Sequence, residues 1–293
     1  MIIGCTGNYR KKEYFTILEK IFKLVSDSNT KFLISDDLKK NTEIVIPNYY
    51  QLVKFEDIIM KADILLAIGG DGTILSTVRR MGLKQIPIMG IHIGGLGFLS
   101  EITEEDLEFC LTEILKKNFF ISNRMLIEVG MKNKNNNSNS LKKYWALNDI
   151  VIDHGTSARV LKIKVNISGN YLNTYEGDGL IIATPTGSTA YSLSAGGPII
   201  YPELDTIAVT PICPHSLSAR PIVLRDIETI TIEILSPYDG MALAIDGQVC
   251  FSINKNTILN ISKGKYYAKM VNIKKDKYFL TLRNKMGWSG NLR

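Results

Sequence analysis

The stretch Gly69-Gly70-Asp71-Gly72-Thr73 decides the fold of this chain, because it separates two segments of different periodicity. Residues 62–68 before it form a short apolar run, and the residues after Thr73 have the spacing of a helix. This order is typical of a strand, a tight turn and a helix. Glycines let the backbone approach a ligand closely, and the free N–H groups at a helix start favour an anion. The stretch therefore predicts an anion-binding turn.

Asp71 is the unusual residue of this turn, because its carboxylate stands among donors that would otherwise bind phosphate. One interpretation is a general base that faces a phosphate donor and accepts a proton from the attacking hydroxyl. The other is an aspartate that caps the helix, which an isolated Gly-Gly-Asp-Gly would favour.

Composition limits the class of protein. The 293 residues are 45% hydrophobic and 22% charged, as expected for a globular protein with one large domain or two ordinary ones. The net charge of +6 is spread without a long basic run, which argues against a nucleic-acid binder. The four cysteines lack metal or redox spacing, so we expect reduced thiols in a cytoplasmic protein. No apolar stretch is long enough to cross a bilayer, so we expect no membrane partner.

Strands and helices alternate over the first 120 residues. Apolar runs predict strands at residues 1–5, 31–35, 62–68 and 86–91, and helical spacing predicts helices at residues 14–25, 49–61, 73–80 and 103–115. This alternation predicts an α/β domain of the Rossmann-like type, a parallel sheet with crossover helices. Ligands bind such sheets at the carboxyl ends of the strands. The first glycine turn and a second one, Gly94-Gly95-Leu96-Gly97-Phe98-Leu99, both fall there.

From residue 119 onward the pattern changes to many short β-rich runs, among them residues 119–121, 126–129, 258–261 and 268–273. Close spacing of short strands predicts an all-β, sandwich-like domain. We expect an α/β domain at residues 1–120, a β-rich domain at 121–275 and a tail, 276–293, that packs back on the first domain. The asparagine-rich residues 132–140 predict a surface loop.

Three stretches of the β-rich domain are candidate sites. Asn148-Asp149 is a polar pair in an apolar run and needs partners or a function. Gly177-Asp178-Gly179 precedes a strand, and Thr184-Pro185-Thr186-Gly187-Ser188-Thr189-Ala190-Tyr191 follows it. Tyr191 can stack on a base and Asp178 can accept from an amine or hydroxyl, although a hydroxyl-rich turn with a buried tyrosine is the alternative.

Two further features have simpler interpretations. Asp246-Gly247-Gln248 lies between two strands, where Asp-Gly usually forms a hairpin turn, although Gln248 can still reach a ligand. His92, His154 and His215 have no partner of metal-ligand spacing, so we expect no protein metal site.

With these motifs in this order, the chain resembles the NAD kinase family. The resemblance extends from about residue 62 to the tail that contains Trp288, and it includes Ser194-Ala195-Gly196-Gly197-Pro198 as well as the motifs above. The Gly-Gly-Asp-Gly element is shared with diacylglycerol and sphingosine kinases. The stretch from Thr184 to Tyr191 is far more specific. Walker A spacing is absent, which argues against a P-loop enzyme.

The resemblance implies transfer of the γ-phosphoryl group of ATP, or of polyphosphate, to the 2′-hydroxyl of the adenosine ribose of NAD, giving NADP. Asp71 would be the general base, and Gly72 and its neighbours would hold the diphosphate. The positions that match nucleotide or dinucleotide contacts are Asn148, Asp149, Arg159, Glu176, Asp178, Thr189, Ala190, Tyr191, Ser192, Leu193, Ser194 and Gln248. Mg²⁺, or another divalent cation, would arrive bound to ATP and need few protein ligands. A homo-oligomer, dimer or tetramer, is implied as well.

Two positions depart from the family pattern. Asp149 stands where many members have Glu, and Glu176 stands where several have Arg or Lys. The shorter carboxylate of Asp149 changes its reach, and an acid such as Glu176 is unfavourable beside a pyrophosphate.

Two alternatives lead to other functions. A lipid kinase of the diacylglycerol-kinase type would share the first glycine turn, but it would lack the stretch from Thr184 to Tyr191. A non-catalytic dinucleotide-binding regulator could lose the base, but Asp71 is present.

Overall fold

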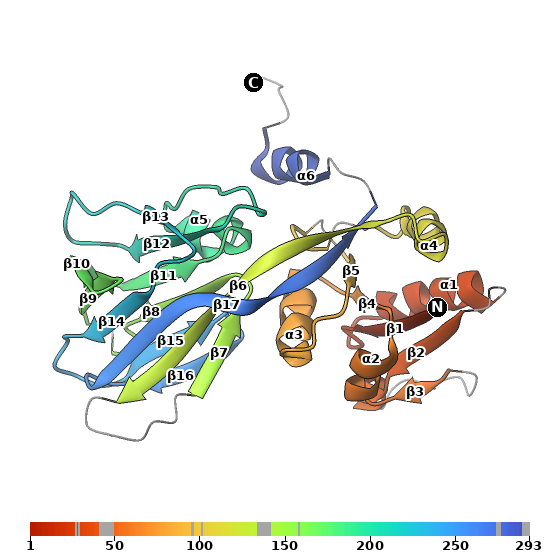
Figure 1. Ribbon diagram of the computed structural model, residues 1–293, viewed down its shortest axis with the longest axis horizontal. Coiled ribbons are helices and arrows are strands. Elements are labelled where there is room, and N and C mark those ends of the chain that lie inside the picture. The colour runs from red at the N-terminus through yellow and green to blue at the C-terminus, as the bar shows by residue number, and fades with distance from the viewer. Residues whose placement is uncertain are drawn as a thin grey trace. The chain divides into compact units, whose positions relative to one another are not determined.

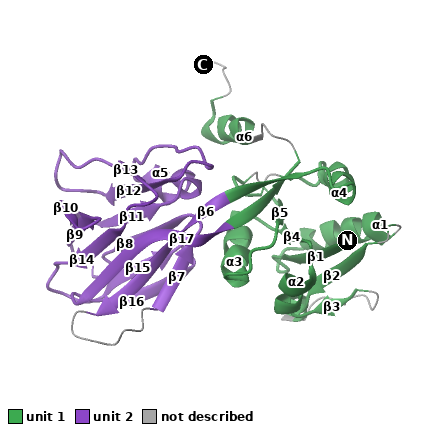
Figure 2. Ribbon diagram, viewed as in Figure 1, with its two compact units in different colours: residues 1–123, 268–293 green, residues 124–267 purple. Residues whose placement is uncertain are grey.

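The computed structural model describes residues 1–26, 28, 30–40, 50–94, 97–100, 102–133, 142–157, 159–273 and 277–288 (Figure 1). The chain forms two compact units (Figure 2). Unit 1 comprises Met1–Asn123 and Ala268–Arg293, and unit 2 comprises Arg124–Tyr267. The chain passes from one unit into the other within the long strands β6 (Phe120–Asn133) and β17 (Thr257–Asn272). Whether residues 1–120, 121–275 and 276–293 fold as separate domains stays a prediction.

Unit 1 is built on a parallel sheet, which confirms the predicted α/β class. Its strands lie in the order β3-β2-β1-β4-β5, and each neighbouring pair is parallel. The end of β17 continues the sheet, with Met270 parallel to Ile88. The elements are β1 (Ile2–Gly7), α1 (Glu13–Ser26), β2 (Lys31–Ser35), the 3₁₀ helix η1 (Asp36–Lys40), β3 (Leu52–Val53), α2 (Phe55–Lys61), β4 (Ile64–Ile68), α3 (Asp71–Met81), β5 (Ile88–Ile91), α4 (Leu107–Leu115) and α6 (Lys277–Met286).

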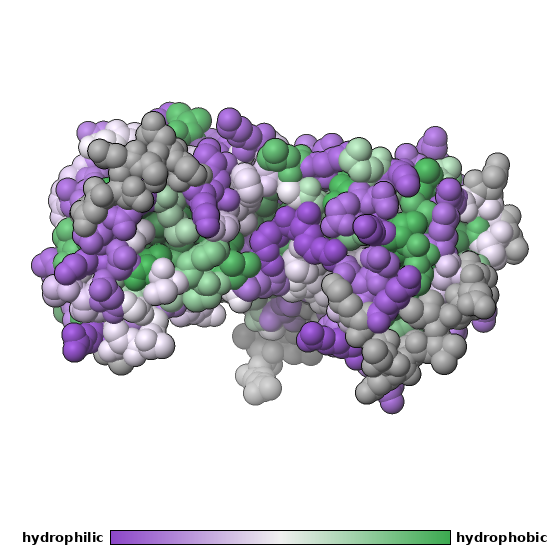
Figure 3. Space-filling model, turned by 90° about the horizontal axis from the view of Figure 1, so that it is seen from below, coloured by the Kyte–Doolittle hydropathy of each residue, from purple (hydrophilic) through white to green (hydrophobic). Residues whose placement is uncertain are grey.

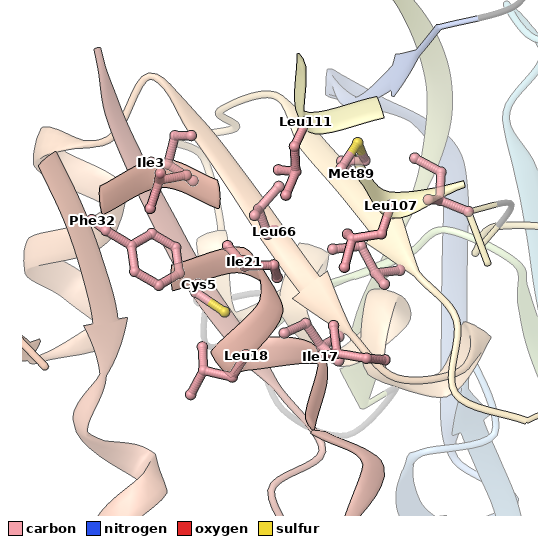
Figure 4. Packing of buried hydrophobic residues seen from close by; sticks show 14 of the residues in the cluster. Ile3, Cys5, Ile17, Leu18, Ile21, Phe32, Leu66, Met89, Leu107 and Leu111 are labelled. Atoms are coloured by element: carbon pink, nitrogen blue, oxygen red, sulfur yellow. The ribbon is translucent and has the colours of Figure 1, made fainter. Parts of the chain in front are cut away.

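Helices cover both faces of this sheet because side chains alternate along each strand. Ile3 and Cys5 of β1 belong to a core that also contains Ile21 of α1 and Leu111 of α4 (Figure 4). Gly4 lies between them in the strand, so a side chain at this position would point to the other face of the sheet. A Cβ atom there would lie 2.2 Å from Cγ2 of Ile58 in α2, so only glycine allows this helix to pack so closely.

Unit 2 contains two sheets. The six-stranded sheet is antiparallel throughout, in the order β13-β12-β11-β8-β15-β16. In the other, β10, β9, β14 and β17 pair antiparallel in that order, and β6 pairs with β17 and β7. The elements not yet given are β7 (Lys142–Ala146), β8 (Asp149–Asp153), β9 (Leu161–Ile167), β10 (Asn170–Gly177), β11 (Gly179–Ala183), the 3₁₀ helix η2 (Thr186–Thr189), α5 (Tyr191–Ser194), β12 (Thr206–Ile212), β13 (Ile222–Arg225), β14 (Ile230–Ile234), β15 (Met241–Ile245) and β16 (Val249–Ile253).

The two sheets of unit 2 share one hydrophobic core. Ile152 and Leu243 come from the six-stranded sheet, and Val165 and Ile232 come from the other. Inward-facing residues alternate with outward-facing ones along these strands, as in β9 and β14. Such packing is that of a β-sandwich, so the predicted all-β class of the second half is confirmed.

Two predicted helices were wrong at their starts. The helix predicted at residues 103–115 begins at Leu107 in α4, because residues 104–106 form a turn. Helical spacing placed a helix at residues 49–61, but Leu52 and Val53 form strand β3 and the helix begins at Phe55. Pairing of Leu52 with Ile34 in β2 extends the sheet and outweighs the local helical pattern. Tyr49 lies outside the described residues.

Strand lengths also differ from the prediction. The runs at residues 119–121 and 126–129 lie in or directly before one strand, β6, and those at 258–261 and 268–273 lie in or directly after β17. Polar residues between the runs had interrupted the apolar pattern. Strand β10 was not predicted, because its sequence is mostly polar. It pairs with β9 through a turn at Ser168 and Gly169, which have φ values of 49° and 86°.

The predicted asparagine-rich loop lies almost entirely outside the described residues. On the face drawn in Figure 3, hydrophobic residues are interspersed with hydrophilic ones. In the described part of the chain, no helix is long and apolar enough to cross a membrane.

Candidate active site

Asp71 is the first residue of helix α3, directly after strand β4 and two glycines. The N–H of Gly69 donates to the carbonyl of Ile91, 2.8 Å away, which ties the end of β4 to the end of β5. A Cβ atom on Gly69 would lie 2.2 Å from Oγ1 of Thr73, so the turn requires glycine at this position. The strand, turn and helix predicted around Asp71 are therefore present.

The Asp71 carboxylate binds the second glycine turn. Its Oδ2 accepts from the N–H of Phe98 at 2.8 Å. Its Oδ1 accepts from the N–H groups of Leu99 and Ser100, at 3.0 and 3.1 Å, and from Oγ of Ser100 at 3.0 Å. A Cβ atom on Gly97 would lie 2.0 Å from Oδ1, so glycine is needed for this approach. The two glycine turns thus meet at one carboxylate, although Gly95 and Leu96 lie outside the described residues.

His92 is a buried neighbour of this carboxylate that sequence reasoning did not select. Its Nδ1 lies 2.8 Å from Oγ of Ser100, the same oxygen that contacts Asp71. Burial lowers the pKa of His92, the charge of Asp71 raises it, and Lys285 and Lys11 lower it further. No sequence signal pointed to Ser100, because its contact with Asp71 spans 29 positions and forms only when the turns meet.

In unit 2, Asn148 and Asp149 are held by the carboxylate of Asp246. Its Oδ1 accepts from the N–H groups of Asn148 and Asp149, at 2.7 and 3.2 Å, and its Oδ2 accepts from that of Leu147 at 3.1 Å. Asp246 and Gly247 have φ values of 50° and 62° between the paired strands β15 and β16, as in a type I′ hairpin turn. The predicted hairpin is therefore confirmed, and its aspartate also anchors the candidate site.

Asp149 is a buried acid with a displaced pKa. Burial, and after it the negative charge of Asp246, raise the pKa of Asp149 to about 7, although a hydrogen bond from the backbone of Tyr191 lowers it. Two carboxyl groups close together resist ionising at once. Asp149 is therefore a group that can exchange a proton near neutral pH.

The hydroxyl-rich stretch after β11 forms η2 and α5, and several of its hydroxyls serve the fold. Oγ1 of Thr184 donates to the carbonyl of Leu147 at 2.5 Å, and Oγ of Ser188 accepts from the N–H of Ile200 at 2.9 Å. Ser192 is fully buried and its Oγ lies 3.0 Å from Oγ1 of Thr210. These contacts hold the segment in one conformation.

Tyr191 lies near several acidic groups of unit 2. The residue is 47% exposed, so it can contact a ligand. Partial burial of the residue raises the pKa of Tyr191. Negative charge on nearby groups raises it too, and these groups are Asp153, Cys213, Asp178 and Asp149. A hydrogen bond to Asp178 likewise raises the pKa of Cys213. The structure thus brings together three of the predicted residues, Tyr191, Asp178 and Asp149.

Glu176 is engaged by a neighbouring strand. Lys162 lies 2.7 Å from its Oε1, and this hydrogen bond lowers the pKa of Glu176. The guanidinium of Arg159 lies 5.6 Å from the ring centre of Tyr238. The backbone N–H of Gln248 closes the hairpin turn on Ile245. Within the described ranges, no three His, Cys, Asp or Glu side chains come together as a metal site.

Family profiles match both halves of the chain. A profile described as the ATP-NAD kinase N-terminal domain matches residues 3–119, and one described as the ATP-NAD kinase C-terminal domain matches residues 147–273. The NAD kinase of Geotalea daltonii is 41% identical over 80% of this chain and 82% of its own. That of Clostridium botulinum strain Loch Maree is 37% identical over 98% of this chain and 96% of its own.

Solved structures agree with these matches. Yeast NADH kinase, complexed with NADH, is 27% identical with a TM-score of 0.90, covering 100% of this chain and 89% of its own. An NAD kinase from Archaeoglobus fulgidus, in complex with ATP, has a TM-score of 0.73 over 99% of this chain and 100% of its own. At 23% identity this second likeness concerns the fold alone. The comparisons do not support the lipid kinase or the non-catalytic regulator.

Proposed function

The chain belongs to the NAD kinase family, enzymes that phosphorylate NAD, and from that premise we propose that it phosphorylates the 2′-hydroxyl of the adenosine ribose of NAD to give NADP. The phosphoryl donor is ATP, through its γ-phosphoryl group, or inorganic polyphosphate. The observation that supports this proposal is the Asp71 carboxylate, held by four hydrogen bonds at the start of α3.

Asp71 acts as the general base in this proposal. The 2′-oxygen attacks the γ-phosphorus, its proton passes to the carboxylate, and the bond from phosphorus to the β–γ bridging oxygen breaks to release ADP. The three backbone donors hold the carboxylate rigidly, so little reorganisation is needed at the moment of reaction. Gly72 and its neighbours at the start of α3 bind the diphosphate, because the N-terminus of a helix attracts anions.

The dinucleotide contacts are proposed for unit 2. Asn148 and Asp149 bind the nucleotide, with the carboxylate accepting from ribose hydroxyls. Tyr191 stacks on a base through its exposed ring, and Asp178 accepts from an amine or hydroxyl. The remaining proposed contacts are Arg159, Glu176, Thr189, Ala190, Ser192, Leu193, Ser194 and Gln248. Ser192 contributes through the fold because it is buried. Glu176 contributes weakly because it is paired with Lys162.

Further properties follow from the family. Mg²⁺, or another divalent cation, arrives with the phosphates of ATP as part of the substrate, an arrangement that needs few protein ligands. The enzyme forms a homo-oligomer, a dimer or tetramer, in the cytoplasm.

The test is a coupled assay for NADP formation from NAD, ATP and Mg²⁺, with the wild type beside Asp71→Asn. The variant keeps the size of the side chain but cannot take the proton. We expect its kcat to fall by about 10²–10⁴-fold, the usual contribution of general acid–base catalysis, while NAD still binds. A variant as active as the wild type would exclude Asp71 as the base. A wild type that binds NAD but forms no NADP would exclude the reaction.

A further inference from the structure

The two oxygens of the Asp71 carboxylate are unequally engaged. Oδ1 accepts three hydrogen bonds, from Leu99 N, Ser100 N and Ser100 Oγ. Oδ2 accepts one from the described residues, the N–H of Phe98 at 2.8 Å. Since a carboxylate oxygen offers about two lone-pair sites, Oδ1 is saturated and Oδ2 retains capacity. A hydroxyl that approaches Asp71 therefore finds its acceptor at Oδ2.

The hydroxyl of Ser100 has a single proton, and its direction can be deduced. The carboxylate of Asp71 can only accept, so Oγ–H points to Oδ1, 3.0 Å away. The contact of 2.8 Å between Oγ and Nδ1 of His92 must then be a donation from the imidazole. His92 therefore carries its proton on Nδ1, and a directed chain runs from His92 through Ser100 to Asp71.

The surroundings of His92 favour a neutral ring. The residue is 8% exposed, and Ser100 is fully buried. Burial has the largest effect on the pKa of His92 and lowers it, the charge of Asp71 raises it, and Lys285 and Lys11 lower it. Nε2 of the ring is buried and has no hydrogen-bond partner among the described residues. A neutral imidazole has one N–H, so the bond to Ser100 uses the only donor of the ring.

The backbone holds both residues in place. The N–H of His92 donates to the carbonyl of Ile102 at 2.7 Å. Gly90 leaves room for the returning chain, because a Cβ atom there would lie 2.9 Å from the carbonyl oxygen of Leu99 and 3.0 Å from Cα of Ser100. The chain of hydrogen bonds is thus built into the end of strand β5.

We propose that His92 and Ser100 are positioning residues for the phosphoryl transfer, which orient the Asp71 carboxylate so that Oδ2 receives the proton of the acceptor hydroxyl. Ser100 saturates Oδ1 and stops the carboxylate from rotating, and His92 orients the hydroxyl of Ser100. This inference rests on the proposed role of Asp71 as the general base.

Four variants test this chain. Ser100→Ala and His92→Leu break it, whereas His92→Asn keeps an N–H donor in about the place of Nδ1. We expect kcat to fall by about ten- to a hundredfold in the first two, the scale of one hydrogen bond to a charged group, with KM for NAD within about twofold. His92→Asn should keep kcat within about threefold. The matched control is Thr77→Val, which removes a buried hydroxyl of α3 bonded only to the carbonyl of Thr73 among the described residues.

Double variants separate this inference from the proposed function. The double variant of Ser100→Ala and His92→Leu should have the same kcat as Ser100→Ala alone. Adding Ser100→Ala or His92→Leu to Asp71→Asn should not lower kcat further, because all three substitutions act through the carboxylate of Asp71. If Asp71→Asn is fully active, Asp71 is not the general base, and the proposed role of Asp71 fails together with this inference. If Asp71→Asn is inactive but Ser100→Ala and His92→Leu keep the wild-type kcat, this inference alone is overturned. It is also overturned if His92→Asn is as slow as His92→Leu, since packing would then explain the loss.

Discussion

Asp149 and Asp246 place two carboxyl groups in the interior of unit 2, where only 4% and 7% of these residues are exposed. Three hydrogen bonds stabilise the buried carboxylate of Asp246, and they come from the backbone N–H groups of Leu147, Asn148 and Asp149. Asp149 has a hydrogen bond from the backbone of Tyr191, but burial and the charge of Asp246 outweigh it and raise its pKa to about 7. Ionising Asp149 therefore works against the folded state.

This residue gives a prediction for stability against pH. Between the ordinary pKa of 3.8 and about 7, the folded state holds the proton of Asp149 more tightly than the unfolded chain does. The contribution of Asp149 to stability is therefore full below pH 3.8 and is lost as pH rises to about 7. Asp149→Asn does not titrate, so from pH 5 to pH 8 it should lose less stability than the wild type, by at least about 1 kcal/mol. Urea unfolding at both pH values measures this.

The control for this experiment is Asp239→Asn, which changes an exposed aspartate of the same unit. It should keep the pH dependence of the wild type. Equal pH dependence in wild type and Asp149→Asn would show that Asp149 ionises without cost.

At the scale of elements, η2 packs through a glycine against Asn148, the residue directly before strand β8. A Cβ atom on Gly187 would lie 2.0 Å from the carbonyl oxygen of Asn148, so glycine allows the 3₁₀ helix to touch the candidate site. Ser188, fully buried, then binds the chain as it returns, because its Oγ donates to Pro185 and accepts from the N–H of Ile200. The segment that carries Tyr191 is thus held from both sides.

We therefore expect Ser188→Ala to destabilise the protein by about 1–3 kcal/mol, because the N–H of Ile200 is left buried without its acceptor. The matched control is Ser216→Ala, an exposed serine bonded to Ser218, which should change stability by less than about 0.5 kcal/mol. Thermal and urea unfolding measure both. A loss in Ser188→Ala no larger than in the control would contradict the role of this hydroxyl.

The whole molecule has a separate hydrophobic core in each unit. The core of unit 1 lies between its parallel sheet and the helices α1 and α4, with Leu66 of β4 fully buried (Figure 4). The core of unit 2 lies between its two sheets, with Leu243 fully buried. Each unit thus places its own candidate residues on its own framework.

For the core of unit 1, Leu66→Ala should cost about 2–5 kcal/mol, because the removed atoms leave a cavity that the sheet cannot close. The matched control is Leu83→Ala in the same unit, where the residue is 73% exposed and the expected change is under about 0.5 kcal/mol. Urea unfolding followed by circular dichroism compares the two. Similar losses in both variants would mean that this core does not support the sheet.

Local properties were determined by the sequence alone. The buried runs, the turn glycines around Asp71 and the Asp246-Gly247 hairpin depend on residues that are close in the chain, so the α/β and all-β classes and the family resemblance could be predicted from them. Where a neighbouring strand decided the outcome, as at Leu52 in β3, the local pattern misled.

Only the tertiary structure decided which side chains meet. Asp246 reaches Asn148 across 98 positions, and Asp71 reaches Ser100 and, through it, His92. These contacts depend on strand register and on the approach of backbones at Gly97 and Gly90. These contacts form because segments that are distant in the chain pack against each other. A local sequence pattern does not predict such packing.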